Sequence, residues 1–153
     1  MTGDLVKQAF ETGVATRSNL MELESAVGEL PIQIDPESMI TNHFAPGIYV
    51  REMFAAKGCV IVGKIHKEEC INVMLSGRIL VATEFGNKEY TAPMVWKGEA
   101  GVKRAGYVLE DTRWLNIHPN KSDTTDLNEI ESTVIAESYE QFDNLLEYKG
   151  EKV

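Results

Sequence analysis

Cysteine is scarce in this sequence, with only Cys59 and Cys70 among 153 residues. Their spacing fits no zinc-binding or dithiol motif, so neither a zinc ribbon nor a disulfide oxidoreductase is indicated. The N-terminal residues are charged and amphipathic, and they lack the apolar block of a secretory signal peptide. We therefore expect two reduced thiols in a cytoplasmic protein.

Long hydrophobic runs and positive charge are also lacking. No apolar run of about 18 residues occurs, which argues against a membrane-spanning helix. The net charge is −9, with −5 on residues 1–40, +2 on residues 41–118 and −6 on residues 119–153. Nucleic acids and anionic membranes require a concentrated positive face, so we expect neither as a partner. The acidic flanks indicate either a solvated surface or contacts with basic positions of a neighbouring subunit.

The composition is otherwise that of a folded domain, because hydrophobic residues make up 43% of the chain. Residues 4–12 and 19–27 carry apolar side chains at helical spacing, and Ser18 and Gly28 suit the two ends of the second helix. A proline-punctuated linker follows. We therefore expect a helical arm and linker over residues 1–40.

Residues 41–120 have a different sequence pattern. Short β-branched and apolar runs alternate with turn signals, one of them at Ser76-Gly77, and no helix-length stretch interrupts them. This pattern predicts an all-β antiparallel barrel or sandwich. The expected strands are residues 48–53, 59–64, 71–75, 79–84, 88–90, 94–96, 106–109 and 112–118.

Residues 121–153 form an acidic extension. A short helix over 126–131, a strand over 132–136 and a helix from Tyr139 to Gly150 are expected there. The stripe of Tyr139, Phe142, Leu145 and Leu146 either packs on the barrel or binds a partner.

The segment Gly63–Gly77 carries the candidate chemistry. Lys64, His66 and Cys70 occupy even positions, and side chains of one parity share a face of a strand. In a barrel, that face would be the cavity.

The region of about residues 45–118 resembles the cupin superfamily of small jelly-roll barrels, whose first motif is G-x5-H-x-H-x3,4-E-x6-G. With Gly77 as the closing glycine, the two histidine positions of that motif hold Lys64 and His66, and the glutamate position holds Cys70. The second motif, G-x5-P-x-G-x2-H-x3-N, resembles the segment around residues 99–101, and its histidine position holds Arg104.

The resemblance implies a fold but a degenerate metal site. Metal-dependent cupins use three histidines and a carboxylate, and only His66 matches that set. Lysine and arginine would repel a divalent ion, so we expect no cofactor. An alternative metal site would recruit His66, Glu69 and Cys70.

Positive groups inside a barrel require an anion, because an unpaired buried charge is costly. Lys64, His66, Cys70 and Arg104 are therefore the expected contacts of a small anionic ligand, with Tyr107 and Trp114 as stacking surfaces. Some metal-free cupins, such as sugar epimerases, bind nucleotide sugars in this way. The alternative is a filled barrel in which Lys64 and Arg104 pair with nearby carboxylates.

The remaining histidines are expected to be structural, His118 at the end of the last barrel strand and His43 in a loop before the first. The chain also resembles small cupin-like proteins of tailed bacteriophages through its VGKIH and EDTRWLNIHP segments. That resemblance implies a host cytoplasm or a virion as its location.

We thus expect a non-catalytic cupin-like protein, either a binder of a small anion or an assembly component. We also expect a homodimer or higher homo-oligomer, with residues 32–34 and 134–135 between subunits. The alternative is a cupin enzyme, either a metal-free isomerase or epimerase or a metalloenzyme with displaced ligands.

Overall fold

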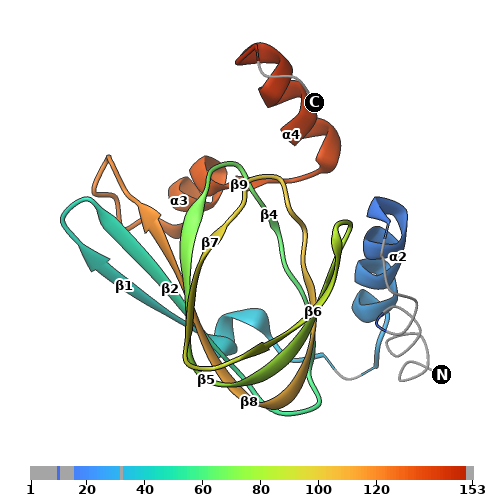
Figure 1. Cartoon of the computed structure of the whole chain (residues 1–153). Coiled ribbons are helices and arrows are strands. Elements are labelled where there is room, and N and C mark those ends of the chain that lie inside the picture. The colour runs from blue at the N-terminus through green and yellow to red at the C-terminus, as the bar shows by residue number, and fades with distance from the viewer. Residues whose placement is uncertain (1–9, 11–15, 32, 151–153) are drawn as a thin grey trace.

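The computed structural model describes residue 10, residues 16–31 and residues 33–150. A seven-stranded antiparallel sheet curls into a barrel, with strand order β1-β2-β8-β5-β6 and with β3 on β8 and β7 on β5 (Figure 1). The expected all-β barrel with helical additions on both sides is confirmed. The strands are β1 (Ile40–Ala45), β2 (Ile48–Ala55), β3 (Val60–Val62), β5 (Cys70–Thr83), β6 (Gly86–Thr91), β7 (Met94–Gly98) and β8 (Ala105–Pro119).

The helices lie outside this barrel. In Figure 1, α2 runs along one side of the barrel, and α3 and α4 lie near the end where a second, two-stranded sheet forms. No described helix is long and apolar enough to cross a bilayer. The elements are α2 (Arg17–Gly28), a 3-10 helix η1 (Pro36–Met39), α3 (Leu127–Val134), α4 (Tyr139–Tyr148), and the paired strands β4 (Ile65–His66) and β9 (Ile135–Ala136).

Two long strands, β5 and β8, dominate the fold. The sequence pattern predicted two shorter strands in place of each of them. The turn expected at Ser76-Gly77 is a bulged bend inside β5, where the pairing with β8 shifts register between Met74 and Ile79. Gly77 takes the bend with a φ of 94°. The first half of β5 pairs with β7 and the second half with β6, so the strand spans both walls of the barrel. The break expected near Glu110 in β8 is likewise absent.

Helix boundaries also differ from the expected ones. Thr16, not Ser18, caps α2: its hydroxyl accepts from the Asn19 amide at 3.1 Å, and the Asn19 side chain accepts from the Thr16 amide. The helix ends at Gly28 as predicted. The strand expected over 132–136 shrinks to Ile135–Ala136, because α3 continues to Val134. The helix expected over 4–12 lies outside the described residues except for Phe10.

Three apolar clusters hold the elements together. One lies inside the barrel around Met74, Val108 and Trp114, and a second joins α2 to the barrel through Leu20 and Leu23. In the third, Phe142 of α4 packs with Ile65 and Ala136, and Tyr139 and Leu146 lie against them. The α4 stripe thus packs within the chain, on the two-stranded β4–β9 sheet, and its packing on the barrel stays a prediction.

The bend in β5 yields a stability prediction. A Cβ at Gly77 would lie 2.7 Å from Thr112 Cα, in addition to the penalty of a positive φ, whereas a Cβ at Gly47 (φ 75°) would contact nothing within 4 Å. We expect Gly47→Ala to lose about 1 kcal/mol from left-handed strain alone. Gly77→Ala should lose about 3 kcal/mol, because the backbone of β8 must also move. Urea unfolding of both variants measures this difference, and equal losses would contradict the account.

Candidate functional site

The inner face of the large sheet carries an unusual row of polar side chains. Strand register places Arg51 of β2, Asn116 of β8 and Asn72 of β5 side by side, and the neighbouring row pairs Tyr49 with His118. Asn72 and His118 are 2% and 4% exposed. Buried polar side chains require hydrogen-bond partners, so this row is a candidate binding site.

Asn72 anchors the row. Its Oδ1 accepts from the Trp114 indole N–H at 3.1 Å and also from the Asn116 amide. Trp114 in turn packs edge-to-face on Trp96, with ring centroids 4.7 Å apart. The hydrogen bonds and the ring packing hold the polar row against an aromatic wall.

A cavity of about 940 Å³ lies against this row. Lys64, His66, Arg104, Tyr107 and Trp114, five of the six side chains expected at a ligand, line it together with Arg51, Asn72, Asn116 and His118. Cys70 stands behind His66 and contacts its ring. The volume falls within the roughly 300–1,000 Å³ typical of small-molecule sites.

The sequence predicted that Lys64, His66 and Cys70 share one face of a strand. In the structure, Lys64 does not share a strand with either of the other two residues. It precedes the short strand β4, and β5 begins only at Cys70. The Lys64 side chain is 58% exposed and forms an ion pair with Glu131 of α3. Lys64 therefore lies at the rim of the cavity with its charge already paired.

Arg51 and Arg104 are different, because their charges have no carboxylate partner within residues 16–31 and 33–150. Arg104 donates only to the Val102 carbonyl at 3.3 Å, and its buried Nε has no hydrogen-bond partner. Glu52, Glu68 and Glu69 pair with other cations: Glu52 with Arg113, Glu68 with Lys149 and Glu69 with Lys97.

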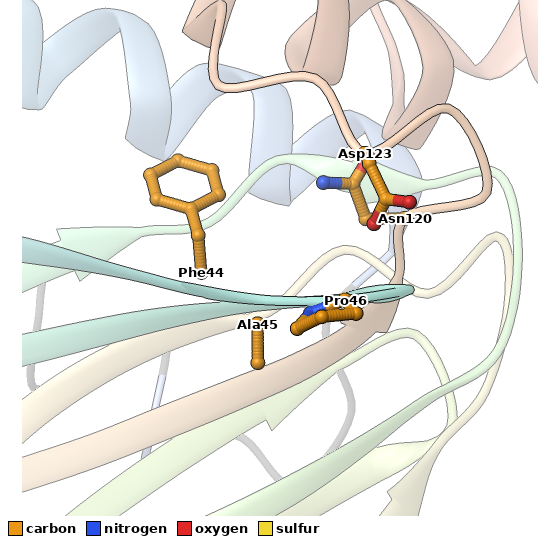
Figure 2. A pocket seen from close by; sticks show the side chains of 5 residues that line it. All are labelled: Phe44, Ala45, Pro46, Asn120 and Asp123. Carbon is orange, nitrogen blue, oxygen red and sulfur yellow. The ribbon is translucent and has the colours of Figure 1, made fainter.

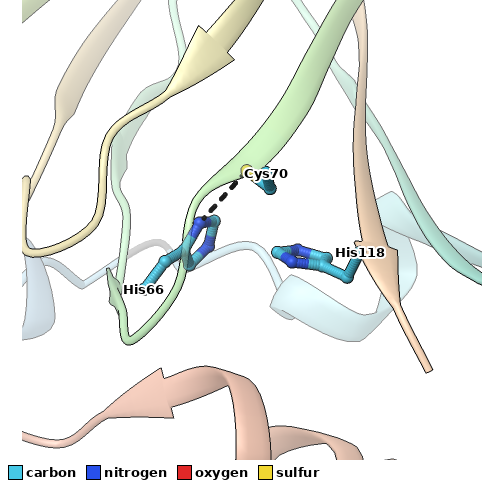
Figure 3. Close-up of side chains that lie close together, drawn as sticks. All are labelled: His66, Cys70 and His118. Carbon is cyan, nitrogen blue, oxygen red and sulfur yellow. Dashed lines mark hydrogen bonds between the residues drawn. The ribbon is translucent and has the colours of Figure 1, made fainter. Parts of the chain in front are cut away.

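Two histidines and a cysteine meet at one end of the cavity. His66 of β4, Cys70 of β5 and His118 of β8 point toward one another, and one ligand atom of each lies within 4.8 Å of the others (Figure 3). Cys70 Sγ is 3.6 Å from His66 Nδ1. The two imidazoles meet edge-to-face with centroids 4.9 Å apart, and His118 also stacks on Tyr49.

These groups are uncharged at neutral pH. Burial lowers the pKa of His66 to about 3, with further lowering from the charges of His118, Arg104 and Arg51. Burial lowers the pKa of His118 to about 4, and Arg51 adds to the shift. Burial raises the pKa of the Cys70 thiol, against the opposing charge of Arg104. Both imidazoles therefore keep a free lone pair.

The trio differs from the predicted metal set in one residue. His118, which was expected to be structural, belongs to it, and Glu69 does not. Glu69 points outward and pairs with Lys97 at 2.8 Å, so His118 takes the place expected for Glu69 beside His66 and Cys70. A signal for His118 was present. Trp114, Asn116 and His118 have the same parity on one strand, so assigning Trp114 to the cavity assigned the other two as well.

Tyr107 lies apart from the trio. It packs against the cluster of Leu20, Leu23, Ala82 and Ala105 beneath α2, where it lines the cavity far along the barrel wall. Its neighbour across the sheet is Val60 of β3. Tyr107 therefore belongs to the packing of the helical arm, and Trp114 is the aromatic side chain next to the polar row.

A smaller hollow of about 280 Å³ lies at the β1–β2 turn, lined by Phe44, Ala45, Pro46, Asn120 and Asp123 (Figure 2). Its polar groups are used within the chain. Asp123 accepts from the Gly47 amide, and Asn120 donates to the Thr124 carbonyl. These bonds close the turn, so we assign the hollow a structural role.

Comparison with known proteins gives structural likenesses only. No family model and no curated protein matches the sequence. Similar solved structures include KdgF from Halomonas sp. (14% identity, 60% of this chain and 89% of that one, TM-score 0.46). A cupin-2 domain protein from Shewanella frigidimarina (9%, 63% and 91%, 0.45) and an RmlC-like cupin from Methanocaldococcus jannaschii (9%, 65% and 96%, 0.45) are also similar.

The buried histidines predict acid sensitivity. An unfolded histidine has a pKa near 6.5, so between pH 6.5 and about 4 the unfolded state binds more protons than the folded state. Stability should be complete above pH 7 and fall as the pH drops, by about 1.4 kcal/mol per pH unit for each fully neutral buried histidine.

Urea titrations between pH 7.5 and 4.5, in buffer with a chelator, measure this slope. His118→Asn should reduce it by about one proton, because only His66 then remains to titrate. An unchanged slope in that variant would show that His118 is not the group held neutral.

Proposed function

We propose that this chain is a cupin-like protein that binds a small anionic ligand inside its barrel. The observation that carries the proposal is the pair of arginines, Arg51 and Arg104, which line one cavity and lack a carboxylate partner among the described side chains. Most of the other described cations pair with an acidic residue of the same chain, as Lys64 does with Glu131 and Lys103 with Glu24.

The physical reason is the cost of leaving such charges without an anion. A partly buried guanidinium loses hydration, and the buried Nε of Arg104 has no hydrogen bond to replace it. A carboxylate or phosphate would accept from Arg104 in the bidentate geometry that guanidinium favours. The amides of Asn72 and Asn116 border the same space and offer contacts to hydroxyl groups.

The shape of the cavity suits a ligand with an apolar or ring-shaped body. Trp114 and Met53 line the wall beside the polar row, so a stacked or aliphatic portion would contact them while the anionic end meets the arginines. Sugar phosphates and small organic acids combine these features. We propose that class as the ligand.

A binding role fits better than metal-free proton-transfer catalysis. A general base works best with a pKa near the operating pH, whereas burial lowers the pKa of His66 to about 3 and that of His118 to about 4. Imidazoles this weakly basic would be poor proton acceptors at pH 7. The isomerase or epimerase alternative therefore has less support than a binder.

We also propose a cytoplasmic homo-oligomer related to the small cupin-like proteins of tailed bacteriophages. The sequence segments given above support the phage relationship. Of the expected subunit contact at residues 134–135, Ile135 belongs to β9 and pairs with β4 of the same chain. Residue 32 of the expected linker contact lies outside the described residues.

The outer face of the sheet is the better candidate for that contact. Ile71, Leu75, Val95 and Phe54 point outward there and are 44–67% exposed. Charged groups on this face pair within the chain, Glu52 with Arg113 and His43, and Lys97 with Glu69. A face with its charges already paired suits an identical apolar face, so we propose a second copy as its occupant.

Ligand binding can be tested by thermal shift with a panel of organic acids, inorganic phosphate, sugar phosphates and nucleotides. A ligand present at about 100 times its dissociation constant should raise Tm by roughly 5–10 °C. Arg104→Gln and Arg51→Gln should each remove the shift. Arg78→Gln is the matched control, because Arg78 is exposed and paired with Glu89 and Glu110. A shift that persists in the double variant Arg51→Gln/Arg104→Gln would contradict the proposal.

Oligomeric state can be tested by light scattering during size-exclusion chromatography. Ile71→Lys combined with Val95→Glu should shift the protein to monomer, because charges replace apolar contacts at the centre of the face. Phe85→Ser is the control, since Phe85 is 76% exposed but lies at the β5–β6 turn. If the wild-type protein is a monomer at about 100 μM, the proposed interface is refuted.

A further inference from the structure

Three side chains at one end of the barrel form a set that anion binding does not require. We propose that His66, Cys70 and His118 bind one divalent transition metal ion of zinc-like character, through two imidazole nitrogens and one thiolate sulfur. This site does not depend on the anion proposal, because none of its three ligands is an arginine.

The geometry is close to that of a tetrahedral centre. Zinc–nitrogen and zinc–sulfur bonds of about 2.05 and 2.3 Å at a tetrahedral angle put the sulfur and nitrogen about 3.6 Å apart. Cys70 Sγ and His66 Nδ1 are 3.6 Å apart. All three ligand atoms lie within 4.8 Å of one another, so a modest rotation of His118 would close the third edge.

The backbone holds the three ligands on separate, paired strands. His66 lies on β4 opposite Ile135 of β9, and His118 lies on β8 opposite Tyr49, on which its ring stacks. Cys70 lies opposite Gly98 of β7, where a Cβ would approach Cys70 Sγ to 3.0 Å. A glycine at this position leaves room for the sulfur. The site is therefore positioned by strands of the two sheets and not by a loop.

The ligand set indicates the class of metal. Two imidazoles and one thiolate suit zinc, copper, cobalt or nickel and do not suit magnesium or calcium, which prefer oxygen ligands. Three protein ligands leave a fourth position, and both histidines line the cavity into which that position would open. Structural zinc sites normally have four protein ligands, so this arrangement resembles an open centre.

Metal binding would release one proton. The Cys70 thiol would lose its proton to solvent as the metal–sulfur bond forms. The thiolate also supplies a negative charge where Arg104 and Arg51 act on His66 electrostatically. Without that anionic ligand, the two guanidinium groups would oppose a divalent ion.

This site is not the cupin quartet described in the sequence analysis. Two of the four quartet positions hold Lys64 and Arg104, which offer no metal ligand at neutral pH, and Lys64 pairs with Glu131 at the rim. The proposed set keeps His66 and Cys70 and adds His118 from the last barrel strand. The ligand combination is therefore this chain's own.

Cobalt titration tests the proposal directly. The full chain, stripped of metal with a chelator, should bind one equivalent of Co²⁺ and develop a near-ultraviolet thiolate-to-cobalt charge-transfer band with visible bands of tetrahedral cobalt. One equivalent of Zn²⁺ should displace it. Cys70→Ser should abolish the charge-transfer band, and His118→Asn and His66→Gln should weaken metal affinity by at least about 100-fold, since even outer-shell changes cause losses of 10–100-fold.

Matched controls come from the same chain. Cys59→Ser and His43→Gln should leave the spectrum and stoichiometry unchanged, because Cys59 packs in the barrel core and His43 is exposed beside Glu52. If a ligand variant does not fold, thiol labelling of wild type replaces it: Zn²⁺ should slow alkylation of Cys70 and leave Cys59 unaffected. Absence of a thiolate band in wild type, its loss in Cys59→Ser, or Zn²⁺-independent labelling of Cys70 would overturn the proposal.

Discussion

The pairing of β5 with β8 is the constraint on which the rest of the structure depends. Both strands are long enough to cross both walls of the barrel, and the bulges near Gly77 let β5 bend without losing its partner. Their register fixes which side chains enter the interior. Asn72 and Asn116 meet inside because Ile71 and Ile117 meet outside, and a shift of one residue would exchange the two faces. The polar row and the apolar outer surface are two consequences of one register.

Charge is distributed according to the same architecture. The acidic flanks read from the sequence pair with cations of their own chain: Asp143 with Arg17, Glu24 with Lys103 and Glu131 with Lys64. The flanking elements thus neutralise the outside and the rim of the barrel. Arg51 and Arg104 point toward the interior, where no acidic residue of the described chain reaches them. Lys57, Lys88 and Lys121 also lack a carboxylate partner among the described residues, but they are exposed. Arg51 and Arg104 differ because they are half-buried at the cavity, where an anion would offset their lost hydration.

The sequence predicted the class of fold because alternation and turn signals are local, and these need no knowledge of pairing. It also placed His66 and Trp114 at the cavity, because the alternation of side chains along a short strand shows which of them share a face. It failed where a break or bulge in the strand changes that alternation. Lys64 was misplaced because it precedes β4 and lies in no strand. β5 was predicted as two strands because Gly77 is a residue typical of turns, whereas here it lies in a bulge of a continuous strand. Arg51 and Asn72 could not be recognised, since their importance arises from cross-strand neighbours distant in sequence.

The two proposed sites are close enough to influence each other. The charges of Arg104 and Arg51 lower the pKa of His66, so a metal ion bound to His66 would interact electrostatically with both arginines. A divalent ion, one thiolate and two guanidinium groups leave a surplus of positive charge that an anionic ligand would reduce. Metal should therefore increase affinity for the anion, and by thermodynamic reciprocity the anion should increase affinity for the metal by the same factor. Because the strands of one sheet fix Arg51, His118 and Cys70, this coupling needs no conformational change and follows from electrostatics alone.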